Sequence, residues 1–478
     1  MTQLMILCGV VILVCITSSK IVYRFGVPAL FIFLLLGMLF GSDGIGGIYF
    51  DNYELAQELC SLGLIFIMFY GGFVTNWKVA KPVAMQAVLL SSLGTAITAG
   101  LTGLFCHLVL RTTLLEGFLI GSVVASTDAA SVFSILRSRE LNLKGGLASL
   151  LEVESGSNDP FAYMLTIVVL SFINNSAQGS IFKLLTMQIV FGVGMGIILA
   201  SLTIFVLNRI KFEIDGVYPI FVTAIVVLGF ALSDLIGGNG FLCAYVTGII
   251  LGNSKITHKK SLVHFFDGIS WLMQIMLFFT LGLLSFPSQM KFIIVPGILV
   301  SLFLIIVARP VAVFSILSWF KIPVKQQLFV SWVGLRGAAS IVFAIFVVTN
   351  DVSIKNDIFH IIFFVALFSV LVQGSLIPYL SKKLDLVEPE NSVLKTFNDY
   401  EEELHTELKE YLVEEDSPWL GKTIMDANID DDILVVMIKR NKDIIIPNGS
   451  TMICEGDIMV LTANNFDNLQ TLESNLEI

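Results

Sequence analysis

The chain has 478 residues, of which 56% are hydrophobic and 14% are charged, and its formal net charge is -10. A soluble domain usually has about 25% charged residues, so this composition excludes an ordinary cytosolic enzyme, a disordered chain and a nucleic-acid-binding protein. Residues 387–478 contain 21 acidic and 6 basic residues, whereas residues 1–386 contain 17 acidic and 22 basic residues. We therefore expect a mildly basic membrane body followed by a separate acidic tail.

Thirteen apolar runs qualify as membrane-spanning helices, because a bilayer core needs about 20 mostly apolar residues per helix. They lie at residues 3–19, 26–41, 55–74, 83–110, 114–136, 147–173, 184–208, 216–236, 239–253, 262–286, 291–319, 327–349 and 357–381. No basic residue precedes the first run, so we interpret it as a retained helix with its N-terminus outside, not as a signal peptide. With this orientation 16 Lys and Arg residues fall on inside loops and 4 on outside loops. The sequence predicts a multi-pass protein of the cell (cytoplasmic) membrane with a cytoplasmic tail.

The order of the spans suggests an internal repeat. If the seventh span is a linker, spans 1–6 start outside and spans 8–13 start inside, as in the inverted repeats of many secondary transporters. Spans 5 and 12 each combine small residues with one charge, Asp128 or Arg336, and spans 6 and 13 each contain a proline, Pro160 or Pro378. The alternative is that the small residues only allow close helix packing.

Four ionisable residues stand out near the middle of apolar runs, where each costs at least ~2.5–3.5 kcal/mol on insertion scales. They are Asp128, Glu154, Asp159 and Arg336, and Glu152 lies nearer the inner end of span 6. An arginine cannot lose its charge, so we expect Arg336 to pair with Glu154. The other carboxylates then have no basic partner, so at least one must be protonated or bind a cation. The alternative is that all of these residues form packing salt bridges.

The sixth span offers the oxygen atoms that a hard monovalent cation needs. Pro160 has no N–H, so the carbonyl of Gly156 loses its helical partner beside Asp159. We expect Asp159 and Asp128 to hold the cation, with Glu152 as a candidate accessory residue. A further arginine, Arg309, interrupts span 11. Its side chain could extend to the membrane surface or form part of a gate, and the sequence favours neither interpretation.

Several spaced motifs resemble the NhaP-type monovalent cation:proton antiporters (cation:proton antiporter family 1). They are Ser126-Thr127-Asp128, Glu154 with Asn158-Asp159-Pro160, the run from Phe241 to Asn253, and Gly334-Leu335-Arg336-Gly337-Ala338. The resemblance covers residues 1–386. It implies about 13 transmembrane helices with a six-helix core domain and a dimerisation domain, hence a homodimer. It also implies that helices 5 and 12 are broken and cross each other at mid-membrane.

The resemblance also implies roles for individual residues. The ion site would be formed by the Thr127 backbone and by Asp128, Ser155 and Asp159. Asn158 would position span 6 against the broken span 5, and Glu154 would pair with Arg336. The Asn-Asp pattern is similar to that of the electroneutral branch. Many relatives have an acidic residue just before the Gly-Gly pair of helix 3, where this chain has Tyr70, which is therefore a candidate accessory residue.

The tail resembles the TrkA-C (RCK C-terminal) regulatory domain. We expect a linker at 387–400 and a small α+β domain at 401–478, with strands at 408–413, 433–438, 443–446 and 458–461 and a short helix at 420–427. Asn441-Lys442 fits a hairpin turn. The resemblance implies a dimeric domain that often senses a small ligand, such as a cyclic dinucleotide. The alternative is a solubilising, dimer-supporting domain without a ligand.

The sequence is thus identified as that of an antiporter that exchanges K⁺ or Na⁺ for H⁺ by alternating access, K⁺ being favoured because TrkA-C-like domains commonly accompany potassium systems. The first alternative is a Na⁺ (Li⁺)/H⁺ antiporter of the same fold. A ligand-gated cation channel is a weaker alternative, because no filter-like sequence is present. An organic-solute symporter is a third. We expect no enzymatic activity, no cofactor and no nucleic-acid partner.

Overall fold

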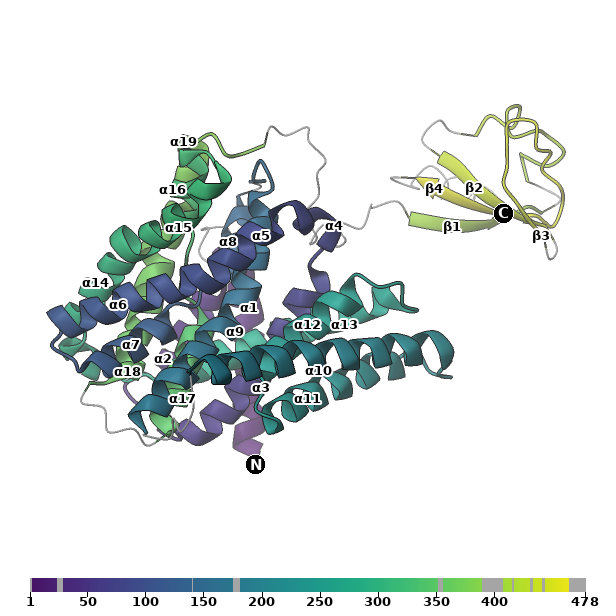
Figure 1. The fold of residues 1–478 in the computed structure, drawn as a ribbon. Coiled ribbons are helices and arrows are strands. Elements are labelled where there is room, and N and C mark those ends of the chain that lie inside the picture. The colour runs from purple at the N-terminus through teal and green to yellow at the C-terminus, as the bar shows by residue number, and fades with distance from the viewer. Residues whose placement is uncertain are drawn as a thin grey trace. The chain divides into compact units, whose positions relative to one another are not determined.

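The computed structural model describes residues 2–23, 29–139, 141–174, 181–350, 356–388, 407–414, 417–429, 433–440 and 443–463. The chain divides into two compact units, Met1–Thr396 and Phe397–Ile478. The first unit is helical, and the second is built on a small sheet (Figure 1).

The first half of the helical unit ends with the long helix α9. Its elements are α1 (Thr2–Tyr23), α2 (Ala29–Phe40), α3 (Tyr53–Val74), α4 (Trp77–Ala80), the 3₁₀ turn η1 (Lys81–Val83), α5 (Ala84–Leu89), the π turn η2 (Leu90–Gly94), α6 (Thr95–Val109), α7 (Leu114–Val124), α8 (Ala129–Ser138) and α9 (Leu147–Ile173).

The second half continues from α10 to α19. Its elements are α10 (Ile181–Arg209), α11 (Val217–Leu235), α12 (Gly240–Gly252), α13 (Lys259–Leu283), η3 (Gln289–Phe292), α14 (Ile294–Phe303), the π turn η4 (Leu304–Ala308), α15 (Arg309–Leu317), η5 (Ser318–Phe320), α16 (Val324–Trp332), α17 (Ala338–Thr349), α18 (Ile358–Phe368), the π turn η6 (Ser369–Gly374) and α19 (Ser375–Lys383).

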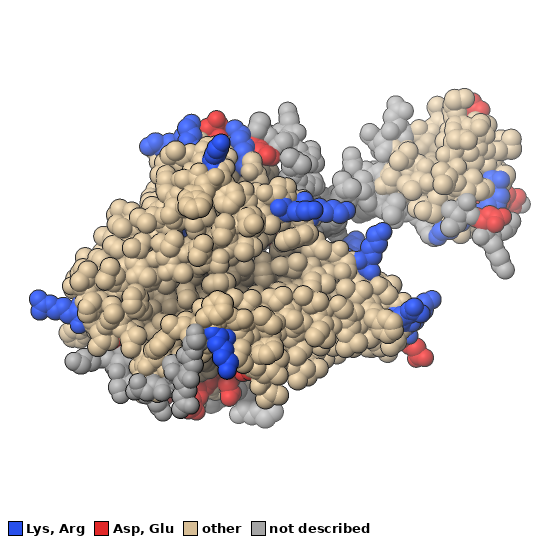
Figure 2. Space-filling model, in the orientation of Figure 1, with Lys and Arg blue, Asp and Glu red and all other residues tan. Residues whose placement is uncertain are grey.

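The helices have the composition of a multi-pass membrane protein. Within the described residues, nine helical segments are long and apolar enough to cross a membrane, and four shorter apolar helices accompany them. On the face seen in Figure 2, the charged side chains of the helical unit gather at its margins, and the broad surface between them is uncharged. The expected mostly helical membrane architecture is confirmed, whereas the number of thirteen spans stays a prediction.

Two interrupted helices fall at equivalent places in the two halves. One break, 125–128, separates α7 from α8, and the other, 333–337, separates α16 from α17. The π turns η2 and η4 lie in the predicted spans 83–110 and 291–319, a second pair of spans that an inverted repeat would relate. Because the main-chain groups of a break have lost their helical partners, other groups must satisfy them.

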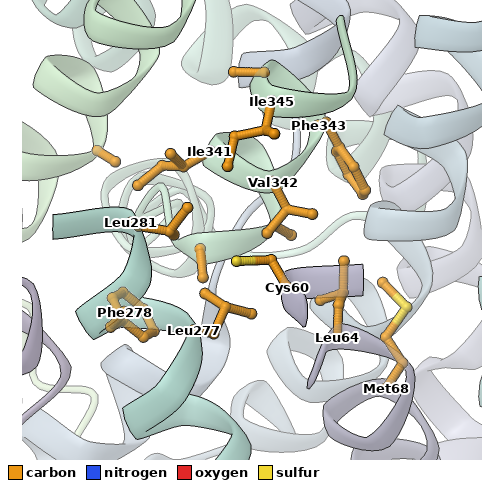
Figure 3. Close-up of a cluster of buried hydrophobic side chains, with 14 of the residues drawn as sticks. Cys60, Leu64, Met68, Leu277, Phe278, Leu281, Ile341, Val342, Phe343 and Ile345 are labelled. Atoms are coloured by element: carbon orange, nitrogen blue, oxygen red, sulfur yellow. The ribbon is translucent and has the colours of Figure 1, made fainter. Parts of the chain in front are cut away.

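Close contacts between helices hold the helical unit together. A buried cluster joins α3, α13 and α17 through residues such as Cys60, Leu277 and Val342 (Figure 3). Helices α3 and α12 approach so closely that a Cβ atom at Gly72 would lie 2.4 Å from the Tyr245 carbonyl oxygen. Small residues therefore set the spacing of the helices, as is common in membranes.

The end of the helical unit is fastened to the loop between α8 and α9. The N–H of Lys144 donates to the carbonyl of Leu386, and the N–H of Glu388 donates to the carbonyl of Asn142, both at 2.9 Å. Leu143 and Val387 are partners in this antiparallel bridge. The bridge holds the last described residues of the unit beside the start of α9.

The tail forms a four-stranded antiparallel sheet in the order β1-β4-β2-β3. The strands are β1 (Glu407–Leu412), β2 (Ile433–Arg440), β3 (Asp443–Ile445) and β4 (Ile458–Ala463). All four expected strands are confirmed. Arg440 pairs with Asp443, as a hairpin requires, although its turn residues Asn441-Lys442 lie outside the described residues, as do most of the expected linker, 389–400, and the acidic run 401–403.

The predicted helix at 420–427 is wrong. These residues form turns, and their main-chain groups bond to a distant segment: Gly421 N–H to the Ile453 carbonyl and Ile424 N–H to the Thr451 carbonyl, both at 3.0 Å. Gly421 has a positive φ of 73°, which a helix does not accommodate. Main-chain hydrogen bonds to residues 451–453 of the same chain therefore replace the helical hydrogen bonds that the sequence suggested.

Candidate functional site

The two breaks contact each other directly. The N–H of Asp128, at the start of α8, donates to the carbonyl of Leu335 in the second break at 2.8 Å. A Cβ atom at Gly337 would lie 2.4 Å from the Cβ atom of Asp128, so this approach requires glycine. The expectation that the two broken helices cross is confirmed by these contacts.

Arg336 stabilises the first break through its carbonyl groups. Its Nη1 donates to the carbonyl of Ala125 at 2.7 Å and to that of Ser126 at 2.9 Å. These carbonyls follow the end of α7, where the helix dipole carries partial negative charge. The Arg336 main-chain N–H also donates to Ser369 Oγ, in the π turn η6, at 3.1 Å.

The expected ion pair between Glu154 and Arg336 is wrong. Glu154 instead receives two hydrogen bonds from Arg309, Nη1 to Oε1 and Nη2 to Oε2, both at 2.9 Å. Arg309 is 3% exposed, so it does not snorkel to the membrane surface. Two-point pairing of this kind is the geometry that best compensates a buried carboxylate. Because Arg309 of α15 pairs with Glu154, the guanidinium of Arg336 donates to main-chain carbonyl groups instead.

Helix α9 bonds to the first break through two polar side chains, Ser155 and Asn158, that lie one turn apart. Asn158 Nδ2 donates to Thr127 Oγ1, and the Thr127 N–H donates to Asn158 Oδ1 at 3.4 Å. Ser155 Oγ donates to the Thr127 carbonyl at 2.8 Å and accepts from the Ala129 N–H at 2.9 Å. The side chain of Asn158 thus replaces helical partners that the break has lost.

The two aspartates of the site have different partners. Asp159 Oδ1 accepts a hydrogen bond from Ser126 Oγ. Asp128 caps α8: its Oδ1 accepts from the Ser131 N–H at 3.2 Å, and its Oδ2 accepts from Ser131 Oγ at 2.5 Å. Carboxylate, hydroxyl and main-chain carbonyl oxygens are the ligands that a hard cation prefers. The structure therefore brings together Asp128, Asp159, Thr127, Ser155 and Asn158.

The two candidate accessory residues lie towards α3. Glu152 Oε1 is 3.5 Å from the Oγ1 of Thr75, whose hydroxyl donates to the Gly71 carbonyl at 2.7 Å. Tyr70 is partly buried on α3 and packs against the main apolar cluster. The roles of both residues at an ion site stay predictions.

Sequence reasoning missed Arg309 and Ser126. The signal for Arg309 was available, because the rule that a buried arginine must find a carboxylate applies to it as well as to Arg336. Ser126 was part of a quoted motif, but only the structure shows which carboxylate its hydroxyl meets.

Comparison with known proteins gives two matching families. Residues 9–383 match the family described as sodium/hydrogen exchanger, transmembrane, and residues 408–476 match the TrkA-C domain. The resemblance found in the sequence is thereby confirmed for both parts of the chain.

Individual relatives agree with the family match. The K(+)/H(+) antiporter NhaP of Alkalimonas amylolytica is 36% identical over 386 residues, which cover 80% of this chain and 67% of that protein. The K(+)/H(+) antiporter NhaP2 of Shewanella baltica is 33% identical over 452 residues, 93% of this chain and 78% of that protein. The solved structure of the sodium proton antiporter MjNhaP1 from Methanocaldococcus jannaschii has a TM-score of 0.70 at 26% identity and covers 80% of this chain and 99% of that one.

Proposed function

We propose that this chain, which belongs to the transmembrane sodium/hydrogen exchanger family and is a cation:proton antiporter, carries either one K⁺ or one proton at a time on Asp159. The observation that supports this proposal is the position of Asp159. Its carboxylate accepts a hydrogen bond from the hydroxyl of Ser126 in a helix break, and it has no arginine partner among the described hydrogen bonds.

The balance of charges favours an electroneutral exchange. Arg309 neutralises Glu154, so the contact between the breaks retains two carboxylates, Asp128 and Asp159, and one guanidinium, that of Arg336. These three groups sum to one negative charge when both carboxylates are ionised. One monovalent cation or one proton then brings the site to zero, which is the low-energy state for groups removed from water. Exchange of one for the other moves no net charge.

The choice of K⁺ comes from two relatives and from the tail. The relatives at 36% and 33% identity are both named K(+)/H(+) antiporters, whereas the sodium proton antiporter structure is 26% identical. The tail belongs to the TrkA-C domain. A Na⁺ (Li⁺)/H⁺ exchange at the same site is the alternative, and Tyr70, in the place of an acidic residue, is the position at which we expect the preference to depart from that of other members.

Asp128, Thr127, Ser155 and Asn158 complete the proposed site. The main-chain carbonyl of Thr127 and the Asp128 side chain contribute oxygen atoms, Ser155 orients that carbonyl, and Asn158 holds α9 against the break. Glu152 serves as an accessory residue on the inner side. We propose that alternating access moves this assembly within a homodimer whose N-terminus is outside.

The tail is cytoplasmic, and we propose that it regulates exchange by binding a small ligand such as a cyclic dinucleotide. The proposed boundaries are 1–386 for the membrane domain, 387–400 for the linker and 401–478 for the tail. The alternative of a tail without a ligand predicts the same exchange whether or not such a ligand is added.

Reconstitution in proteoliposomes tests the exchange and its site. Gradients of K⁺, Na⁺ or Li⁺ are imposed across pH values, with a proton-sensitive dye inside the vesicles. We expect a K⁺ gradient to drive proton movement at a rate that clamping the membrane potential does not change. We expect Asp159→Ala to abolish this proton movement, while its elution in size-exclusion chromatography stays that of the parent protein. Exchange retained by Asp159→Ala would remove the proposal, and cation flux without proton counterflow would favour the channel instead.

A further inference from the structure

Ser126 links the two helix breaks to Asp159. Its side chain is 1% exposed, and its hydroxyl donates to Asp159 Oδ1. Its carbonyl oxygen accepts from Arg336 Nη1 at 2.9 Å and from Ser340 Oγ at 3.4 Å. The main chain of Ser126 is therefore held from the opposite break, and the hydroxyl retains rotation about its own side-chain bonds.

A serine hydroxyl can adapt to each state of a neighbouring carboxylate. It has one donor and two acceptor positions. Against an ionised carboxylate it donates, as it does in this structure; against a protonated carboxyl group it can accept; and beside a cation it can turn its oxygen towards the ion. A hydrogen bond to a charged group is stronger than one between neutral groups, so the first of these states is substantially stabilised.

We propose that Ser126 is a positioning residue that holds the ion-free Asp159 carboxylate and sets how K⁺ and protons compete for it. This inference rests on the proposed role of Asp159. A proton needs only one carboxylate oxygen, whereas a cation needs several oxygen ligands. Removal of the hydroxyl therefore costs the cation a ligand, whereas the proton keeps the carboxylate oxygen that it needs, and the competition shifts towards the proton.

Other charged and titratable groups also surround Asp159. Asp128 faces it from the α7–α8 break, Glu154 from its own helix and Tyr245 from α12. Arg336 approaches from the second break, and Arg309 is engaged by Glu154. These groups remain in place in a Ser126 variant, so a change in cation and proton competition can be assigned to the hydroxyl.

The matched control is Ser122, four residues earlier, in the last turn of α7. It is also 1% exposed, but its hydroxyl donates to the Leu119 carbonyl at 2.9 Å and accepts from Thr166. Ser122→Ala removes an equally buried hydroxyl that has no contact with the site residues among its described hydrogen bonds.

The test measures exchange by full-length protein in proteoliposomes over a series of K⁺ concentrations at several pH values. For Ser126→Ala we expect the half-saturating K⁺ concentration to rise about tenfold at fixed pH, and inhibition by protons to extend to higher pH, with the maximal rate retained. Ser126→Thr keeps the hydroxyl and should behave like the parent protein, as should Ser122→Ala.

Unchanged half-saturation and pH profile in Ser126→Ala would overturn the inference. If Ser126→Ala gives no folded protein, Ser126→Cys replaces it, because a thiol is a weaker donor of similar size; a K⁺ half-saturation equal to that of the parent then overturns the inference in the same way. Asp159→Ala separates the two proposals: if it retains exchange the proposed function fails, whereas an inactive Asp159→Ala with an unaltered Ser126 variant refutes only the role of Ser126.

Discussion

Arg309 and Glu154 form a two-point ion pair in which both donor–acceptor distances are 2.9 Å and both side chains are almost fully buried. The pair joins α15 to α9 five residues before Asp159. It therefore fixes the helix that carries the proposed ion-binding carboxylate, and it removes Glu154 from the groups that could bind the ion.

Substitution of one partner should strongly destabilise the protein. Arg309→Gln leaves the Glu154 carboxylate buried without its partner, which costs roughly 3–5 kcal/mol when a buried pair is broken. We expect a lower melting temperature in detergent for this variant. The double variant with Glu154→Gln should lose less stability than the sum of the losses of the two single variants. The matched cycle combines Glu154→Gln with Arg336→Gln. A larger coupling energy in that second cycle would show that Arg336, not Arg309, is the partner of Glu154.

Two adjacent glycines on α3 should respond differently to alanine. A Cβ atom at Gly72 would lie 2.4 Å from the Tyr245 carbonyl oxygen and 3.1 Å from the Ile249 nitrogen, whereas a Cβ atom at Gly71 would meet nothing within 4 Å. Gly72→Ala must push α3 away from α12, at a cost of about 1–3 kcal/mol. Gly71→Ala should be neutral or slightly stabilising, since alanine favours helix. Thermal unfolding in detergent compares them, and equal melting temperatures would contradict the close packing.

The tail should lose stability in acid through Asp457. Burial raises the pKa of this carboxyl group, but hydrogen bonds from Arg440 and from the Cys454 N–H outweigh burial and hold the pKa below its ordinary value. A carboxyl group with a lowered pKa in the folded state stabilises the fold above its unfolded pKa, and this contribution disappears as the pH falls through the folded value. Hydrogen exchange of β2 and β4 in the full chain should therefore quicken in acid beyond its intrinsic pH dependence.

Asp457→Asn provides the matched comparison for that pH effect. The amide keeps the size of the side chain but cannot accept the two charged hydrogen bonds of Arg440, so we expect a loss on the order of 2 kcal/mol at neutral pH. The difference between the two proteins should shrink as the pH falls. A constant difference at every pH would indicate that the charge of Asp457 does not stabilise the tail.

The sequence located the breaks better than it located their partners. Small residues surround Asp128 and Arg336 within apolar runs, and the family resemblance of these two motifs implied both breaks. The partner of Glu154 depends instead on which distant helix lies beside α9. Arg309 and Arg336 both lie in apolar runs, so charge alone did not distinguish them. In the tail, the strands follow from local patterns, whereas the turns at 420–427 depend on pairing with 449–453.

The bridge between 142–144 and 386–388 has a mechanical consequence. The chain passes out of the membrane unit while it is fastened to the loop that joins α8, which Asp128 caps, to α9, which carries Asp159. A pull on the chain beyond residue 388 is therefore transmitted first to that loop, and through it to the ends of both helices. The bridge thus ties the point at which the chain leaves the helical unit to the two helices that bear the aspartates.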